Sequence, residues 1–131
     1  MTGQPSAFTE YPSPLSFDQT VERLTQAIEK AGMTVFARID HAANARAVGM
    51  QMPATTVVIY GNAKGGTPIM LASPLAALDL PLRALVREAT DGATKIVFHP
   101  IADLLAPAGV PSDVAERLNP AQMLLVASVT P

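Results

Sequence analysis

Residues 16–40, SFDQTVERLTQAIEKAGMTVFARID, contain a helix pattern followed by a strand pattern, and this succession decides the fold class. Four apolar residues recur at the period of one helix face: Phe17, Val21, Leu24 and Ile28. Ser16 and Gln19 fit a capping box at the start of this helix, and Gly32 is suited to its end. Residues 33–40 then alternate as a strand does. The stretch therefore predicts a helix that packs on a sheet.

The strand prediction divides the residues of segment 33–40 between the two faces of the sheet. The expected faces are Val35, Ala37 and Ile39 on one side and Thr34, Phe36 and Arg38 on the other. Farther along, TTVVIY at residues 55–60 is β-branched and apolar, as in a strand covered on both faces or at the sheet centre. Residues 82–89 and 94–99 flank Asp91-Gly92, which predicts an antiparallel hairpin closed by a two-residue type I′ turn.

Helix-start residues mark the remaining elements. Asp40 is placed to cap a short alanine-rich helix over residues 41–48. Four other residues fit helix starts: Thr67, Ser73, Ser112 and Asn119, the last with Gln122 as its capping-box partner. The order of elements predicts an α/β fold of the α+β type. We expect a two-layer sandwich in which one mixed or antiparallel sheet of about five strands has helices on one face.

The size and composition of the chain suit one domain. It has 131 residues, 49% of them hydrophobic, which is enough for a single core. We expect residues 1–14 to form an N-terminal edge segment, because Pro5, Pro12 and Pro14 cannot donate to a ladder, and residues 15–131 to form a single α/β domain. A formal net charge of -2 with only 9 Lys and Arg argues against a nucleic-acid partner.

The absence of cysteine excludes a disulfide framework, a thiolate nucleophile and a cysteine-ligated metal centre. The first residues are polar and proline-rich, unlike a secretory signal, and no apolar run is long enough to span a bilayer. We therefore expect a cytoplasmic protein without a membrane partner, and the sequence indicates no cofactor. Arg38 and Arg87 fall on predicted strands, where salt bridges are expected rather than contacts with a substrate.

Three segments carry a family resemblance, at residues 17–53, 57–70 and 78–92. They hold three ordered motifs: Ile39-Asp40-His41 followed by Ala45, Gly61-Asn62, and Leu80-Pro81-Leu82. With these motifs the chain resembles DUF 302, a bacterial and archaeal family of unknown function, over much of its length. The family usually has proline after Gly-Asn, where Ala63 stands here. The resemblance implies an α/β fold, often found as a dimer, and brings no established reaction.

The segment GNAKGGTP, residues 61–68, follows a predicted strand and leads toward a predicted helix start. Backbone N–H groups in such a setting can hold an anion, with help from other groups, since a helix terminus adds only about 0.3–1 kcal/mol. The segment is not a Walker A motif, because Lys64 precedes the Gly65-Gly66 pair. The alternative is a tight turn whose glycines only permit unusual backbone angles.

Asp40 and His41 lie at a strand-to-helix junction, where a side chain can face a cleft. A histidine in the first turn of a helix is favoured in its neutral form, which can act as a general base or a metal ligand. The alternative is that Asp40 only caps a helix and His41 is a surface or packing residue. His99 and Asp103 could join His41 in a two-His, one-carboxylate metal site, but their spacing carries no metal-binding signature. A histidine at a strand end is more often only a polar terminus, so no metal site is expected.

We expect a non-catalytic domain that binds a small polar or anionic ligand where eight residues approach one another at the sheet end: Asp40, His41, Tyr60, Asn62, Lys64, Gly65, Gly66 and Thr67. In the alternative, the protein is a small enzyme in which His41 is a general base or metal ligand. Asn62 would then orient the substrate, and Lys64 would offset its negative charge.

A third possibility is a structural dimerisation module. A two-layer fold leaves one sheet face uncovered, and five residues are expected to supply it: Phe36, Val58, Tyr60, Leu85 and Val97. Monomers rarely tolerate such an apolar face, so we expect a two-fold homodimer. The alternative is that AQMLLVASV, residues 121–129, folds over this face of its own chain.

Overall fold

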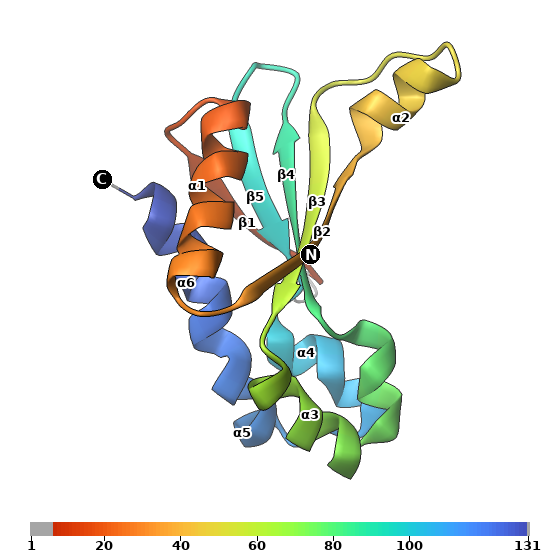
Figure 1. Ribbon diagram of the computed structural model, residues 1–131, viewed down its shortest axis with the longest axis vertical. Coiled ribbons are helices and arrows are strands. Elements are labelled where there is room, and N and C mark those ends of the chain that lie inside the picture. The colour runs from red at the N-terminus through yellow and green to blue at the C-terminus, as the bar shows by residue number, and fades with distance from the viewer. Residues whose placement is uncertain (1–6, 131) are drawn as a thin grey trace, which may run out of the picture.

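The computed structural model describes residues 7–130 as a two-layer α+β sandwich (Figure 1). Within this range the strands are β1 (Thr9–Ser13), β2 (Thr34–Asp40), β3 (Thr55–Gly61), β4 (Leu82–Glu88) and β5 (Thr94–Phe98). They form one sheet in the order β1-β5-β4-β3-β2, and every neighbouring pair is antiparallel. The predicted fold class is confirmed, with an antiparallel rather than a mixed sheet. The first six residues of the expected edge segment lie outside the described residues.

The helices of the described range are α1 (Phe17–Lys30), α2 (His41–Ala47), α3 (Ala63–Ala72), α4 (Ile101–Leu105), α5 (Ser112–Ala115) and α6 (Asn119–Val129). Short 3₁₀ turns join them: η1 (Pro74–Asp79), η2 (Ala106–Ala108) and η3 (Glu116–Leu118). Figure 1 shows α1 and α6 side by side over one face of the sheet. It also shows α2 at one end of the molecule and α3, α4 and α5 at the other.

The predicted capping box at the start of α1 is confirmed. Ser16 Oγ accepts a hydrogen bond from Gln19 N at 3.2 Å, and Gln19 Oε1 accepts one from Ser16 N at 3.3 Å. The apolar face of the helix then packs on the sheet, with Leu24 and Ile28 fully buried. These residues share one core with the buried side chains of β3, β4 and β5. The core therefore consists of the apolar face of α1, which has a 3.6-residue period, packed on the apolar face of the strands, which has a two-residue period.

A β-bulge in β2 changes the face that its residues occupy. Val35 pairs with Tyr60 and Ala37 pairs with Ile59, which leaves Phe36 as an extra residue. Val35 packs against the core, but from Ala37 onward the alternation is reversed and Arg38 faces α1. The prediction that Val35, Ala37 and Ile39 share one face is therefore wrong, because a bulge shifts the two-residue period by one.

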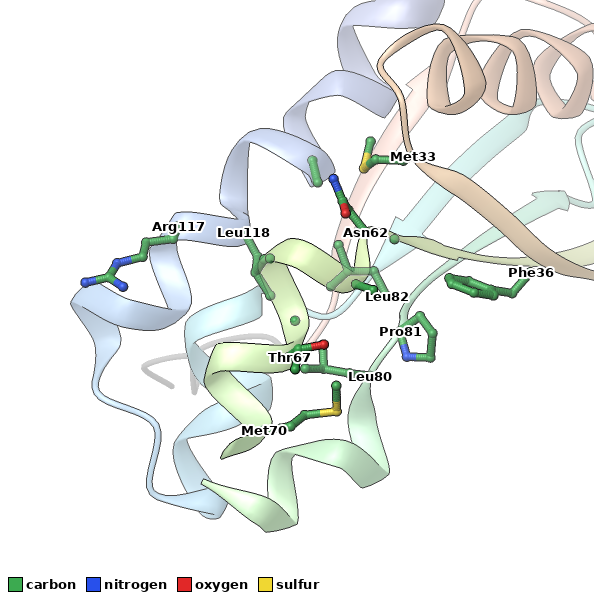
Figure 2. A pocket seen from close by; sticks show the side chains of 15 residues that line it. Met33, Phe36, Asn62, Thr67, Met70, Leu80, Pro81, Leu82, Arg117 and Leu118 are labelled. Carbon is green, nitrogen blue, oxygen red and sulfur yellow. The ribbon is translucent and has the colours of Figure 1, made fainter. Parts of the chain in front are cut away.

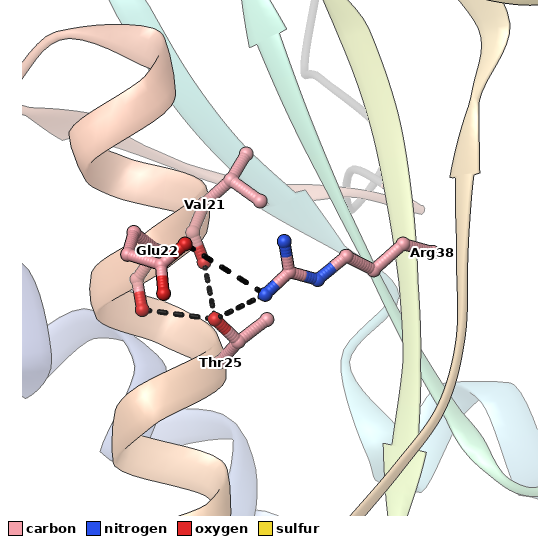
Figure 3. Close-up of polar contacts among 4 residues, drawn as sticks. All are labelled: Val21, Glu22, Thr25 and Arg38. Carbon is pink, nitrogen blue, oxygen red and sulfur yellow. Dashed lines mark hydrogen bonds and ion pairs between the residues drawn. The ribbon is translucent and has the colours of Figure 1, made fainter.

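Arg38 fixes the bulged strand to α1 (Figure 3). Its Nη2 donates to Thr25 Oγ1 at 2.8 Å and lies 3.9 Å from Glu22 Oε2. The Thr25 hydroxyl in turn donates to main-chain carbonyls of the preceding helical turn. Arg87 pairs with Glu10 of β1 at 3.6 Å. The expected salt bridges of both arginines are confirmed, and since the carboxylates are exposed, each pair adds at most about 1 kcal/mol.

The hairpin between β4 and β5 is antiparallel as predicted, but its turn differs. Gly92 N donates to Ala89 O at 2.9 Å, and Gly92 has a φ of 84°. A type I′ turn requires a positive φ at Asp91 as well, and no described residue other than glycine has one. The loop therefore has three residues, Thr90 to Gly92, and Asp91 Oδ1 accepts a hydrogen bond from Ala93 N at 3.0 Å.

Several predicted helix starts are displaced. The helix expected after Thr67 begins earlier, at Ala63, so Pro68 lies inside α3. Ser73 precedes the expected short turn η1 but makes no side-chain cap hydrogen bond. Ser112 and Asn119 also make no cap, because each is already a helical residue. Gln122, expected as a box partner, is buried and donates to His99 O at 2.7 Å, which ties α6 to the end of β5.

The side of the sheet opposite α1 and α6 carries apolar side chains that are half-exposed, except for Val97, which is only 8% exposed. We call this surface the open face, and its central residues are Val57, Ile59, Leu85 and Val97, with Phe36 at one side. Val58 and Tyr60, which were assigned to this surface, are fully buried on the helix side, so the predicted set was one residue out of register on β3. β3 is thus apolar on both faces but lies second from the edge of the sheet.

The C-terminal helix does not cover the open face. α6 packs beside α1, and Arg23 Nη1 of α1 donates to Ser128 O of α6 at 3.3 Å. Leu125 and Val129 of α6 enter the core on the helix side. The alternative in which AQMLLVASV folds over the open face is therefore wrong, because its apolar stripe is already used in closing the core.

Candidate functional site

The eight residues expected to form one site are divided between the two ends of the sheet. Asp40 pairs with Thr56 at one end of β2, whereas Thr34 pairs with Gly61 at the other. Six residue steps along the strand separate these ends, a distance of about 20 Å. Because β2 and β3 are adjacent and antiparallel, the end of one strand lies beside the start of the next, so Asp40 and His41 are far from Asn62. The prediction that these segments approach one another is wrong.

Asp40 and His41 have a local structural setting at the α2 end. Asp40 Oδ1 accepts a hydrogen bond from Ala43 N at 2.9 Å and caps α2. His41 is exposed in the first turn of this helix, and within residues 7–130 its side chain makes no hydrogen bond or ion pair. The geometry matches the alternative in which Asp40 is a cap and His41 a surface residue.

Tyr60 lies in the core rather than at the surface. Its side chain is fully buried on the helix side of β3, and its hydroxyl has no hydrogen-bond partner among residues 7–130. Burial raises the pKa of this hydroxyl well above its ordinary value, because the charged form would lose its hydration. The ring contributes to packing, and the unpaired hydroxyl has an energetic cost.

The candidate metal ligands are not brought together. His99 follows β5 at the α3 end of the sheet, where its Nδ1 lies 2.7 Å from Ala7 O and its ring lies 4.9 Å from that of Phe8. β5 runs in the same direction as β3, so His99 lies at the α3 end, whereas His41 follows the antiparallel strand β2 and lies at the α2 end. Within residues 7–130 no group of three histidine, aspartate or glutamate residues is arranged to hold a metal ion.

The segment GNAKGGTP is helical from Ala63 onward. Asn62 caps α3, and its Oδ1 accepts a hydrogen bond from Lys64 N at 2.9 Å. Gly65 N and Gly66 N both donate to Asn62 O at 3.0 Å, so these amides are not free to hold an anion. Neither glycine has a positive φ. The segment is therefore neither the predicted phosphate-type loop nor the tight turn that was its alternative.

Two glycines stand inside this helix, where each costs about 1 kcal/mol relative to alanine. A Cβ on Gly65 would lie 3.4 Å from Leu118 Cδ2, at the point where α3 passes η3. A Cβ on Gly66 would face Leu80 and Met70 at 3.8 Å. The missing side chains leave open space beside the start of α3.

That space is a pocket of about 410 Å³ (Figure 2). Its wall is formed by the start of α3, by the segment Leu80-Pro81-Leu82 before β4, by Met33 and Phe36, and by Leu118 and Ala121. Of its fifteen lining residues, only Asn62, Thr67 and Arg117 have polar side chains. The pocket therefore suits a ligand with an apolar body, and volumes of this size hold small organic molecules.

Two of the three motifs noted in the sequence meet at this pocket, namely Gly61-Asn62 and Leu80-Pro81-Leu82. They belong to neighbouring antiparallel strands, β3 at its end and β4 at its beginning, so sheet pairing places them side by side. The contributions of η3 and α6 were missed, because no sequence pattern connects Leu118 with residues 61–67. The third motif, at Asp40 and His41, lies at the other end.

The fold is that of a small α+β domain with an apolar pocket at one end of an antiparallel sheet. The sequence matches the family described as "Domain of unknown function DUF302" over residues 9–125, and the chain belongs to this family. The fold is also that of an uncharacterized conserved DUF302 protein from Bacillus stearothermophilus, with a TM-score of 0.79 and 16% identity over 94% of this chain and 95% of that one.

Curated relatives share part of the sequence. The protein named fluoride-specific ion channel FluC 1 of Brucella suis is 41% identical over 81 residues, which cover 62% of this chain and 31% of that protein. The FluC 1 protein of Brucella abortus matches to the same extent, over 29% of its length. The chain thus spans less than a third of these relatives. Among residues 7–130 of the present chain, no helix is long and apolar enough to cross a membrane.

Proposed function

We propose that this protein binds a small organic molecule with an apolar body in the pocket at the start of α3. The observation that carries the proposal is the cavity itself, about 410 Å³ in volume and apolar at all but three of its lining residues. Burial of apolar ligand surface there contributes about 25 cal/mol per Å². The main part of the expected ligand is apolar, unlike the polar or anionic ligand inferred from the sequence, because the glycine-rich segment presents a helix surface and not a loop of free amides.

Binding is favoured over catalysis by the chemistry of the lining. Asn62, Thr67 and Arg117 supply hydrogen-bond donors, but none of them is a general base at neutral pH. His41, the candidate base of the enzyme alternative, is at the other end of the sheet and cannot reach a ligand in this pocket. The enzyme alternative is therefore less well supported than a binding role.

The substitution Thr67→Phe tests the pocket. Thr67 is an exposed residue of α3 at the edge of the cavity, so an aromatic side chain there is expected to occupy the space a ligand needs. A neutral apolar dye, N-phenyl-1-naphthylamine, serves as the probe, and fluorescence titration measures its dissociation constant. We expect at least a tenfold loss of affinity, which corresponds to about 1.4 kcal/mol.

The control is Leu71→Phe on the same helix. Leu71 is 79% exposed and does not line the pocket, so the added ring alters the surface without entering the cavity. Affinity for the dye is expected to stay within a factor of two of the wild type. Equal weakening by both substitutions, or no dye binding to the wild type, would contradict the proposal.

The open face supports a second role, assembly into a homodimer. Its apolar centre is flanked by large exposed side chains, with Phe8 exposed to 58% and Phe36 to 53%, and no element of residues 7–130 covers it. A two-fold partner that presents the same face would bury this surface with matching chemistry. Two arginines beside the open face are already paired within one chain, Arg83 with Asp79 and Arg87 with Glu10.

Sedimentation equilibrium tests the dimer. We expect a mass near twice the 13.7 kDa of one chain at micromolar concentrations. Leu85→Lys places a charge at the centre of the open face and is expected to give the single-chain mass, because burying an unpaired ammonium costs several kcal/mol. Leu75→Lys, at a side chain exposed on η1, is the control and is expected to leave the dimer intact. A wild-type mass of one chain at every concentration measured would exclude the homodimer.

The channel relatives favour a third role, association with a membrane protein. The 41% identity over 81 residues means that a segment similar to this chain is part of proteins named fluoride-specific ion channels. Fluoride itself does not suit the pocket, because a small hydrated anion needs several converging donors and the lining supplies few. On this proposal the chain would bind its organic ligand beside a channel partner, and its expected cytoplasmic location stays a prediction.

A further inference from the structure

We propose that the ligand of the α3 pocket ends in a carboxylate that accepts hydrogen bonds from the side-chain amide of Asn62. The inference rests on the proposed binding function and goes further, since it names the polar group of the ligand. It follows from the orientation of one amide, from the charges around the pocket and from the shape of its apolar wall.

The cap of α3 fixes which way the Asn62 amide is turned. Asn62 Oδ1 accepts the hydrogen bond from Lys64 N at 2.9 Å, so the oxygen side of the amide is already in use. The nitrogen side, Nδ2, carries two N–H donors and has no partner among residues 7–130. Figure 2 shows this amide between Met33 and Leu82, with its nitrogen turned toward the start of α6. The pocket therefore offers donors here and selects a ligand atom that accepts.

Two cationic side chains lie at or beside the pocket. Arg117 lines it and Lys64 lies in the first turn of α3, and neither forms an ion pair within residues 7–130. No aspartate or glutamate lines the cavity. In Figure 2 the Arg117 side chain extends away from the cavity, so its charge acts through space rather than by contact. Such an arrangement favours an anionic end group over a neutral one and disfavours an ammonium.

The remaining lining residues of the pocket are mostly apolar and favour a ligand with a hydrocarbon body. Leu80, Leu82 and Leu118 face the cavity with the flexible side chains of Met33 and Met70, and methionine adapts to ligands of irregular shape. The combination of one donor amide with an apolar wall is the pattern of a monocarboxylate with a medium-length chain or a ring.

Three probes with the same eight-carbon chain separate the end groups: octanoate, 1-octanol and octylamine. Isothermal titration of the wild-type protein gives a dissociation constant for each. We expect octanoate to bind at least tenfold more tightly than 1-octanol, and octylamine to bind more weakly than either. The chain is constant, so the ratio reports only the end group.

The variant Asn62→Asp tests whether the Asn62 amide binds the carboxylate. Aspartate keeps an oxygen that caps α3 but replaces the two donors by a second acceptor and adds a negative charge. We expect octanoate to lose at least tenfold in affinity, 1-octanol to change by less than threefold, and octylamine to gain. Asn44→Asp makes the same charge change at an exposed residue of α2, at the other end of the sheet, and is expected to leave all three constants unchanged.

The outcomes distinguish this inference from the proposed function. If all three probes bind equally, or if Asn62→Asp and Asn44→Asp weaken octanoate alike, the carboxylate assignment is wrong while the pocket still binds apolar molecules. If neither 1-octanol nor the neutral dye binds the wild type, the proposed function fails as well. Should Asn62→Asp fail to fold, the order of the three wild-type constants decides the inference by itself.

Discussion

Leu24→Ala is expected to lower the free energy of unfolding by about 3 kcal/mol, within the range of about 2–5 kcal/mol for buried leucines. Leu24 is fully buried on the sheet-facing side of α1 and packs in the one core formed with β3, β4 and β5. Truncation removes apolar contacts and leaves a cavity between two layers whose backbones are held by hydrogen bonds. The surroundings are therefore expected to collapse only in part.

Leu78→Ala is the matched control, because it makes the same chemical change at a side chain that is 87% exposed in η1. Its expected effect lies within about 0.5 kcal/mol. Urea denaturation followed by circular dichroism gives both values, and the method suits a chain without tryptophan. A loss below about 1 kcal/mol for Leu24→Ala, or equal losses in both variants, would mean that the α1 face is not the centre of the core.

The parts of the fold that the sequence predicts are those that local chemistry specifies. α1 has its apolar period, its capping box and a glycine that adopts a φ of 82° just after its end. The strands β2, β3, β4 and β5 lie within a residue or two of the predicted ranges, and the β4–β5 pairing follows from their glycine turn. In each case neighbouring residues determine the conformation, so one sequence is sufficient.

The errors arise where distant contacts decide. The bulge at Phe36 follows from how β2 pairs with β3, and it reverses the faces of all later residues of the strand. The α3 start is helical although it contains Gly65 and Gly66, because Asn62 caps it and the main-chain amides of both glycines donate to Asn62 O. A single-residue shift on β3 likewise moved Val58 and Tyr60 from the core to the open face in our prediction.

Only the part of the candidate site that is contiguous in sequence could be predicted, because the rest depends on contacts between distant segments. Asn62 and the glycines were recognised as a unit because they are adjacent in sequence, and they do line the pocket. Asp40 and His41 were joined to them on the assumption that strand ends converge, which holds for parallel strands. In this antiparallel sheet, neighbouring strands that follow one another in the chain finish at opposite ends of the sheet. Leu118 and Ala121 reach the pocket only through the packing of η3 and α6, which no local pattern indicates.

Tyr60→Phe is expected to stabilise the protein. The Tyr60 hydroxyl is buried with no hydrogen-bond partner among residues 7–130, and such a group costs about 1–3 kcal/mol compared with its hydrated state. Phenylalanine keeps the ring in the core beside the same apolar neighbours and removes only the oxygen. We expect the free energy of unfolding at pH 7 to rise by about 1 kcal/mol.

The same burial predicts a second effect that grows with pH. Because desolvation raises the pKa of Tyr60 in the folded chain, the folded state keeps this proton at pH values where the unfolded chain, with an ordinary pKa of about 10, has lost it. Each pH unit above about 10 therefore favours the unfolded state by about 1.4 kcal/mol until the folded group also titrates. Tyr60→Phe lacks this pH-dependent loss of stability, so its free energy of unfolding is expected to exceed that of the wild type by about 1 kcal/mol at pH 7 and by about 2 kcal/mol or more at pH 11.

Urea denaturation at pH 7, 9, 10 and 11 measures the difference in the free energy of unfolding between the two proteins, in which the contributions of all other titrating groups cancel. Tyr11→Phe, which replaces the other of the 2 tyrosines, is the control. A constant difference across this range, or the same widening for Tyr11→Phe, would show that the Tyr60 hydroxyl is hydrated in the folded protein.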